Sequence, residues 1–238
     1  MKSFAVLFLL FLSAVAMAGT PVKTLVAIED IYAPLGFDTN DSTQVIVSGL
    51  LPNLCHKSPY TEVKVIKNKI EITVGSLKYD ETNPFCRPFE VPFVETIDVG
   101  LLDKGNYDIV VNGESIFEKK SKIFVDESIS TSVDEFAYAY VNYMVKGDGD
   151  RVVELNGYNP SDCFELDDIE VISNKINTYS VLPKMKKVRD FCPMKMVPFT
   201  YSVKVPNTIE SKKILLHVRA MSGKSVNAVF VNADLKEN

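Results

Sequence analysis

The chain has 238 residues but no tryptophan, only two histidines and only four cysteines. Without tryptophan it lacks the buried indole that packs on the disulfide of antibody domains. The cysteines never show the C-x-x-C spacing of zinc sites, and no Gly-x-Ser-x-Gly motif occurs. We interpret His56, next to Cys55, as a loop residue and His217 as a solvent-facing residue of a strand, so neither stands beside an activated nucleophile. These absences predict a protein with no enzymatic activity and no metal or other cofactor.

The only long apolar run lies at the N-terminus. A positive charge at Lys2, an apolar stretch from Phe4 to Leu12 and the small-x-small sequence Ala16-Met17-Ala18 follow the order of a secretory signal. That stretch is too short to span a bilayer, and no later segment is apolar enough. Residues 1–18 are therefore predicted to be a cleaved signal peptide. The mature protein is expected in a bacterial periplasm or outside the cell, with no insertion in a membrane.

Charge of one sign is only slightly in excess. The formal net charge is -5. A mildly acidic chain is a poor ligand for nucleic acid and is not attracted to anionic lipid. The one basic cluster runs from Lys184 to Arg189 and is local to the second half. Nucleic acid is therefore excluded as an expected partner.

The chain contains two copies of one pattern. Gly49–Cys55 matches Gly157–Cys163 at an offset of 108, and Val65–Ile70 matches Val171–Ile176 at an offset of 106. The second offset continues through Phe85-Cys86 against Phe191-Cys192 and Val91-Pro92-Phe93 against Val197-Pro198-Phe199. We infer a first domain at residues 19–127 and a second at residues 128–238, each close to the commonest domain size.

Each copy contains one pair of cysteines. In an oxidising compartment an even number of cysteines indicates disulfides, and four cysteines allow three connectivities. Since each copy had to be self-sufficient before it was doubled, we predict the bridges Cys55–Cys86 and Cys163–Cys192. Each bridge closes a loop of roughly 30 residues, which contributes on the order of 3–4 kcal/mol in the chain-entropy model.

Short alternating apolar runs separated by Asn, Gly, Pro and Asp predict β-strands. In copy one they are Val26–Tyr32, Gln44–Gly49, Val63–Ile66, Ile70–Val74, Phe93–Val99, Tyr107–Val111 and Lys122–Val125. Seven short strands in about 100 residues are typical of an immunoglobulin-like sandwich. We therefore predict an all-β protein made of two tandem immunoglobulin-like β-sandwiches with one disulfide each. The cysteines lie at strand ends, so each bridge is expected to tie two loops together at one end of a sandwich.

The repeated motif resembles that of secreted bacterial modules, which read Gly-x-Leu-Pro-x-x-Cys, a hairpin, a second Cys, Pro-Phe and then Gly-x-Tyr-x-Val-x-Val-Asn-Gly. Copy one contains Gly49, Leu51, Pro52, Cys55, Cys86, Pro92, Phe93, Gly105, Tyr107, Ile109, Val111, Asn112 and Gly113. Copy two keeps Gly157, Pro160, Cys163, Cys192, Pro198 and Phe199 but has Lys212-Lys213-Ile214 in place of Gly-x-Tyr. The resemblance covers most of the mature chain. It implies an immunoglobulin-like sandwich and carries over no catalytic residues.

Acidic residues cluster at Asp148-Gly149-Asp150 and Asp167-Asp168. Carboxylates near glycine can hold Ca²⁺, but the full D-x-D-x-D-G loop with a distal Glu is absent. Residues 147–150 also align with residues 39–42, as a turn before a strand in both copies. We interpret the segment as a turn, and calcium binding at Asp148–Asp150 stays an open alternative.

The remaining candidates for function are the loops that the cysteines anchor, because binding residues concentrate on loops held by a rigid scaffold. They comprise residues 56–60 and 77–81 in copy one, and residues 164–166 and 182–187 in copy two. The predicted contact residues are His56, Lys57, Tyr60, Tyr79, Lys184, Lys186 and Lys187. We predict a non-enzymatic binding or adhesion protein that recognises a protein partner, with a peptidase inhibitor as one form of it. The alternative is a structural or accessory domain pair of an envelope assembly.

Overall fold

The computed structural model describes residues 20–79, 82, 84–131 and 136–235. The predicted signal peptide at residues 1–18 lies outside this part of the chain. The described residues form β-strands and one short 3₁₀ helix, η1 (Asn232–Leu235), with no α-helix among them. Within the same ranges, no helix is long and apolar enough to cross a membrane. The predicted all-β class is confirmed.

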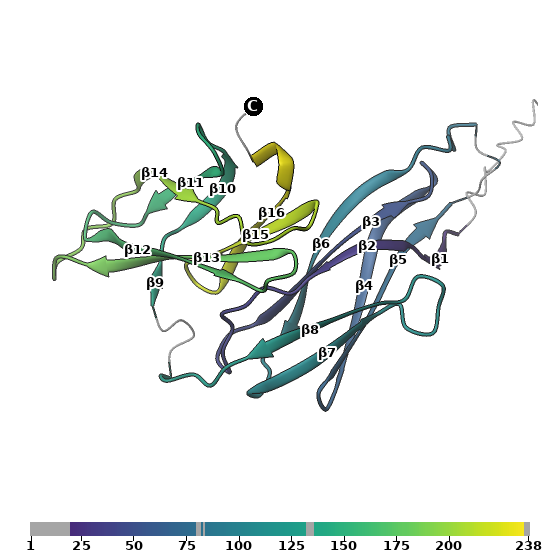
Figure 1. Ribbon diagram of the computed structural model, residues 1–238, viewed down its shortest axis with the longest axis horizontal. Coiled ribbons are helices and arrows are strands. Elements are labelled where there is room, and N and C mark those ends of the chain that lie inside the picture. Colours follow the sequence, from purple (N-terminus) through teal and green to yellow (C-terminus); the bar gives the residue numbers. More distant parts are fainter. Residues whose placement is uncertain (1–19, 80–81, 83, 132–135, 236–238) are drawn as a thin grey trace, which may run out of the picture.

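The strands fall into two groups that lie side by side, which we call domain 1 and domain 2 (Figure 1). Domain 1 contains β1 (Val22–Leu25), β2 (Ala27–Tyr32), β3 (Thr43–Leu51), β4 (His56–Ile66), β5 (Lys69–Lys78), β6 (Val91–Gly100), β7 (Gly105–Val111) and β8 (Lys119–Val125). Domain 2 contains β9 (Ala137–Tyr138), β10 (Val141–Lys146), β11 (Val152–Asn159), β12 (Phe164–Ser173), β13 (Thr178–Lys187), β14 (Val197–Lys204), β15 (Lys213–Ala220) and β16 (Lys224–Val231).

Each domain consists of a three-stranded and a five-stranded sheet. In domain 1 the smaller sheet has the order β2-β3-β6, and the larger has the order β1-β5-β7-β8 with β4 paired to β5. In domain 2 the corresponding orders are β10-β11-β14 and β12-β13-β15-β16, with β9 paired to β13. The pairs β5–β7 and β13–β15 are parallel, which the sequence pattern did not predict. The predicted architecture of two β-sandwiches is confirmed.

Domain 1 has eight strands, so the prediction of seven per sandwich was wrong. The additional strand, β1, pairs with β5, whereas β2 pairs with β3 in the other sheet. Only Val26 separates β1 from β2, so the chain changes sheets within one apolar run. The seven predicted strands correspond to β2 through β8.

Each sandwich encloses its own hydrophobic core. In domain 1, alternate residues of the two sheets point inward, among them Val45 and Val47 of β3 and Ile70 and Ile72 of β5, all essentially buried. Domain 2 has a separate core that includes Leu155 of β11. Burying one such side chain contributes about 1.5–3 kcal/mol, and a one-residue slip of register would expose the whole set. The alternation therefore determines which face of each strand lies inside.

A glycine and a phenylalanine face each other at the same place in both sandwiches. Gly49 of β3 pairs with Phe93 of β6, and Gly157 of β11 pairs with Phe199 of β14. A Cβ atom on Gly49 would lie 2.4 Å from the carbonyl oxygen of Ala27 and 2.7 Å from the ring of Phe93. Any side chain is therefore excluded there by a backbone group and by the ring. This contact explains why Gly and Pro-Phe occur together in each copy.

Domain 2 packs on the outer face of the three-stranded sheet of domain 1. Tyr32 and Ile46 of domain 1 and Leu215 of domain 2 form a buried apolar cluster between the domains. Beside it, the guanidinium of Arg219 on β15 donates to both carboxylate oxygens of Asp41, and both side chains are buried. The two domains therefore share an interface with an apolar centre and a buried ion pair.

His217 lies in this interface, so its prediction as a solvent-facing residue was wrong. Its side chain is fully buried, its Nδ1 lies 2.8 Å from Oδ1 of Asn227, and its ring lies 5.5 Å from that of Phe37. Loss of solvent lowers the pKa of His217 to about 4, and the nearby positive charge of Arg219 acts in the same direction. The outer face of β15 would be exposed in an isolated sandwich, but here domain 1 covers it.

Candidate binding surface

A disulfide ties two connecting segments together at one end of each sandwich. Cys55 follows β3 and Cys86 lies between β5 and β6, with their Cα atoms 5.0 Å apart. Cys163 and Cys192 occupy the equivalent segments of domain 2, with Cα atoms 5.5 Å apart. Both predicted bridges are confirmed. In each domain both bridged segments carry the chain from one sheet to the other, so the bridge fixes the rim of the sandwich there.

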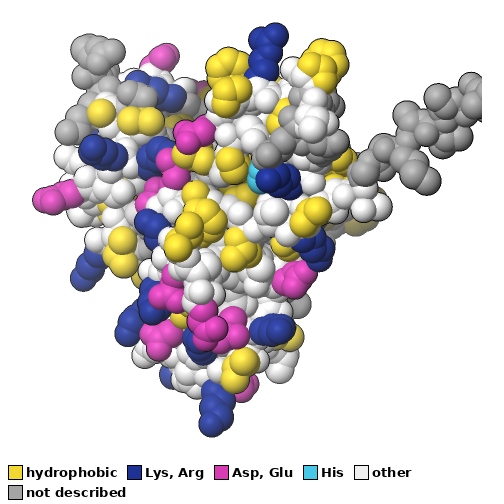
Figure 2. All heavy atoms as spheres, turned by 90° about the vertical axis from the view of Figure 1, so that its right-hand side faces the viewer, with side chains coloured by type: hydrophobic (Ala, Val, Ile, Leu, Met, Phe, Trp, Pro, Cys, Tyr) yellow, Lys and Arg dark blue, Asp and Glu magenta, His cyan; other side chains and the backbone are white. Residues whose placement is uncertain are grey.

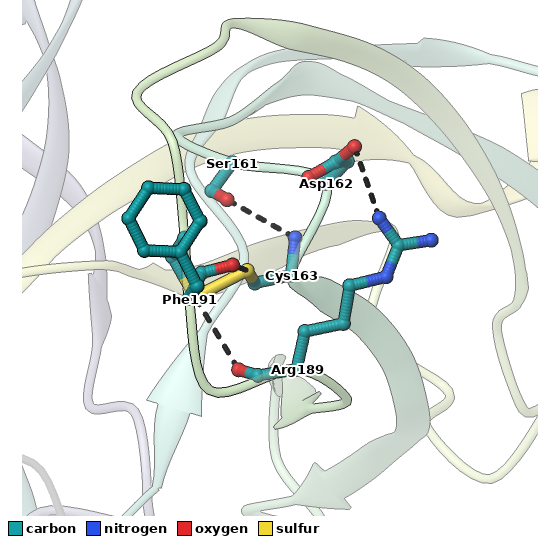
Figure 3. Close-up of a disulfide and its surroundings, with 6 residues drawn as sticks. Ser161, Asp162, Cys163, Arg189 and Phe191 are labelled. Carbon is teal, nitrogen blue, oxygen red and sulfur yellow. Dashed lines mark hydrogen bonds and ion pairs between the residues drawn. A yellow bond between two sulfur atoms is a disulfide. The ribbon is translucent and has the colours of Figure 1, made fainter.

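The surroundings of the second bridge are held by short-range polar contacts (Figure 3). The backbone N–H of Cys163 donates to Oγ of Ser161 at 3.1 Å. An ion pair of 3.3 Å joins Arg189 to Asp162 and so connects the two segments a second time. The ring of Phe191 projects away from the bridge and is 83% exposed.

Beside the first bridge lies a depression of about 440 Å³, which we call the rim pocket. It is lined by Leu54, Cys55, Lys57, Tyr79 and Phe85. The backbone N–H of Tyr79 donates to the carbonyl of Cys55 at 2.9 Å, which holds one wall against the bridge. Phe85, adjacent to Cys86, is 78% exposed. The lining is mainly apolar, with one cationic side chain at its edge.

His56 is not a loop residue, contrary to the prediction. It begins β4 and is buried, and its Nδ1 lies 2.8 Å from Oγ of Ser76 on the neighbouring strand β5. A serine at this distance from a histidine has the spacing of a nucleophile and its base. Ser76 is completely buried, however, so an external substrate does not reach its hydroxyl in this conformation.

The other predicted contact residues of domain 1 lie on β4 and just after β5. Lys57 is exposed at the rim pocket. Tyr60 is half-buried over Gly75, its partner across the strands, and Nζ of Lys23 lies 4.6 Å from its ring centre. Tyr79 is 42% exposed. The structure therefore brings Lys57 and Tyr79 together at the pocket and places Tyr60 in the sheet.

The predicted lysines of domain 2 lie on β13, not in a loop. Lys184 is half-buried, binds Glu170 at 2.8 Å and lies over the ring of Phe136 at 4.1 Å. Lys186 pairs with Asp167 at 3.3 Å, and Lys187 is exposed at the end of the strand. These side chains belong to a different domain from the rim pocket and do not contribute to it.

Apolar side chains are exposed at both bridged rims, which was not predicted from the sequence. In addition to Phe85 and Phe191, the exposed large residues of these segments are Phe89, Val188, Met194 and Met196. Figure 2, which views the molecule from the domain 1 end, shows hydrophobic side chains in several groups over the upper part of this face. The sequence feature that could have indicated these exposed side chains is the Phe-Cys pair, which occurs in both copies outside the strands.

No metal centre is found in the part of the chain that the structure describes, where no three His, Cys, Asp or Glu side chains are grouped to hold an ion. A turn was predicted at residues 147–150, and residues 148–151 form a bend and a turn before β11. Asp167, from the other acidic pair, is engaged with Lys186.

Residues 45–121, from β3 to the start of β8, match the family model described as the ORF11 beta-sandwich domain. No curated protein matches the chain, and neither does any solved structure. The family match thus covers most of domain 1, including both cysteines of its bridge, and it supports a β-sandwich module there.

Proposed function

We propose that this is a secreted, non-enzymatic binding protein that holds a protein partner at the rim pocket of domain 1. The observation that carries the proposal is the exposure of Phe85 and Tyr79 around an apolar depression that a disulfide stiffens. Exposed apolar patches on soluble proteins frequently mark interaction sites.

Aromatic side chains are suited to this role because each buries a large area while losing few rotamers. Residues of this kind dominate interface energies, and truncating one often costs above about 1 kcal/mol. Lys57 at the edge supplies the polar border that such patches usually have. The bridge Cys55–Cys86 keeps the walls in place before the partner arrives, which lowers the entropic cost of binding.

The cellular location is part of the proposal. The two disulfides fit an oxidising compartment, and the signal-like N-terminus agrees with export to the periplasm or the cell exterior. We further propose that both domains descend from one module like those of secreted bacterial proteins. The identical order of strand pairing in the two domains supports a duplication.

A role without catalysis agrees with the placement of the histidines. His56 and His217 are both buried, and each is engaged by a neighbouring polar side chain, Ser76 or Asn227. Neither ring is positioned to exchange protons with a molecule in solvent. We therefore assign them to the architecture of the fold.

The test is affinity capture from an envelope extract by the immobilised full chain. Phe85→Ser is the test variant, and Phe191→Ser, an equally exposed residue beside the second bridge, is the matched control. Binding at the rim pocket requires a discrete partner that is captured by the wild type and by the control but lost with Phe85→Ser. A partner lost only after changes on the sheet edges would support the accessory domain pair instead. Melting curves of both variants establish that neither is unfolded.

A further inference from the structure

The outer face of the sheet β10-β11-β14 has a groove with a chemistry unlike that of the rim pocket. The groove is about 290 Å³ and is lined by Asn142, Tyr143, Asn156, Gly157, Tyr158, Pro198, Phe199 and Thr200. No charged side chain is in this lining, although 24% of the chain is charged. The groove instead combines aromatic rings with amides and a hydroxyl.

The strand register places these groups on one face. Tyr143 of β10 is opposite Asn156 of β11, and Tyr158 is two residues further along β11 on the same side. The register shifts between Val141 and Tyr143, so the strand bulges and leaves Asn142 exposed. Tyr143 and Tyr158 are 56% and 39% exposed. Two phenol rings therefore flank the groove on a rigid sheet.

A hydrogen bond orients the polar floor of the groove. Oγ1 of Thr200 donates to Oδ1 of Asn156 at 2.7 Å. This bond fixes which end of the amide is the NH₂ group, which makes only a long contact of 3.5 Å with the carbonyl of Glu154. The NH₂ group of Asn156 thus retains donor capacity for a ligand, and the lone pairs of Thr200 are acceptors beside it.

The equivalent face of domain 1 forms part of the interface between the two domains. There the outer residues Ile46 and Ser48 of β3 are buried, because domain 2 packs on this sheet. The positions that correspond by register to Asn142 and Tyr143 hold Glu29 and Asp30, and Glu29 pairs with Lys213 of domain 2 at 2.8 Å. The exposed tyrosines of domain 2 therefore do not serve the packing of the two domains.

We propose that the face formed by Tyr143, Asn156, Tyr158 and Thr200 binds an uncharged oligosaccharide. The C–H side of a pyranose ring is apolar and stacks on an exposed tyrosine ring, whereas its hydroxyl groups both donate and accept hydrogen bonds. Asn156, Asn142 and Thr200 line the groove and provide both kinds of partner. The absence of Lys and Arg from the lining excludes recognition of a phosphate or carboxylate by charge pairing. The volume is at the lower end for ligand pockets, which fits shallow contact with a short stretch of a glycan.

The test uses the full chain and soluble hexasaccharides of glucose (β-1,4- and α-1,4-linked) and of N-acetylglucosamine. Titration followed by amide NMR shifts should map binding by at least one of them to β10, β11 and β14. Tyr143→Ala and Tyr158→Ala should each weaken that sugar at least about fivefold. Tyr143→Phe should keep most of the affinity, because the ring remains. Phe124→Ala on β8, an aromatic side chain that is 39% exposed as Tyr158 is, is the matched control and should leave the affinity unchanged.

Three results would overturn the proposal. One is the absence of shifts with every hexasaccharide at millimolar concentration. Another is binding that Tyr143→Ala and Tyr158→Ala leave intact. The third is a dimer of the wild type that these two substitutions dissociate, since the face would then be an interface between copies. None of these results depends on the protein partner of the rim pocket, so the two proposals fail independently.

Discussion

Arg219 on β15 and Asp41 before β3 form a two-pronged ion pair between the domains, although 178 residues separate them in the chain. Nη1 of Arg219 also donates to the carbonyl of Gly36 at 2.7 Å, and its guanidinium lies 5.0 Å from the ring centre of Tyr138. The cation is thus surrounded by acceptors and rings. Because both side chains are buried, water cannot solvate the charge that is left when its partner is removed.

Arg219→Met is therefore expected to lower the free energy of unfolding by about 3–5 kcal/mol, since it leaves the carboxylate of Asp41 buried without its cation. Replacing both residues, with Asp41→Leu added, should recover a large part of that loss. Urea unfolding followed by tyrosine fluorescence measures both values. Lys69→Ala, which removes the exposed pair with Glu71, is the control and should cost less than about 1 kcal/mol. An equally small loss for Arg219→Met would contradict the structural role of the pair.

Stability should fall in mildly acidic solution because of His217. Its pKa is about 4 in the folded protein and about 6.5 in an unfolded chain, so between these values only the unfolded state takes up the proton. The contribution of neutral His217 to the free energy of unfolding is fully present above pH 6.5. It decreases as the pH falls towards 4, by about 2 kcal/mol at pH 5. His217→Gln keeps a hydrogen-bonding group near Asn227 but does not titrate. Unfolding curves at pH 7 and pH 5 should therefore differ less for this variant; an unchanged difference would assign the effect to carboxylates.

Gly49→Ala should destabilise domain 1 by more than the roughly 1–3 kcal/mol of ordinary overpacking, because the added methyl meets the backbone of Ala27. Adding Phe93→Ala removes the ring but not the carbonyl oxygen at 2.4 Å, so the double variant should not regain wild-type stability. Thermal melts provide the comparison. Val94→Ala, at the exposed neighbour of Phe93, is expected to change stability little. Full recovery in the double variant would show that the ring alone required glycine.

His56→Ala should lower stability by about 1–3 kcal/mol, since it leaves the buried hydroxyl of Ser76 without its histidine partner. The sequence interpretation, a histidine in an open loop, predicts no effect. Lys57→Ala, one residue along the strand and exposed, is the control and should stay within about 0.5 kcal/mol. Chemical denaturation of the two variants separates the alternatives.

The sequence was sufficient for the strands and bridges because those features have local or repeated signals. Alternation along residues 93–99 and 122–125 reflects one buried face, and the duplication paired Cys55 with Cys86 without any knowledge of the fold. The turn before β11 was likewise predictable, because residues 147–150 repeat a turn of domain 1. These elements depend on contacts within one sandwich.

The errors arise where a contact lies outside one sandwich or where a strand is irregular. His217 alternates correctly on its strand, but nothing local to it shows that domain 1 covers the outer side. Ser58 and Pro59 suggest a loop by composition, yet the strand continues through them as a bulge, with Ser58 at a φ of 48° and a register shift between Lys57 and Tyr60. The exposed phenylalanines were not predicted, because they lie outside the strands, where no alternation of apolar and polar residues indicates which side chains are exposed.

The covered face of domain 1 has a consequence for how the protein is synthesised. All eight strands of domain 1 leave the ribosome before β15 and β16, whose Leu215 and Val229 pack against Tyr32 and Ile46. During that interval the nascent chain presents an apolar sheet to its surroundings, a state prone to association with other chains. A product truncated before Lys213 would contain every strand of domain 1 and still remain in that exposed state.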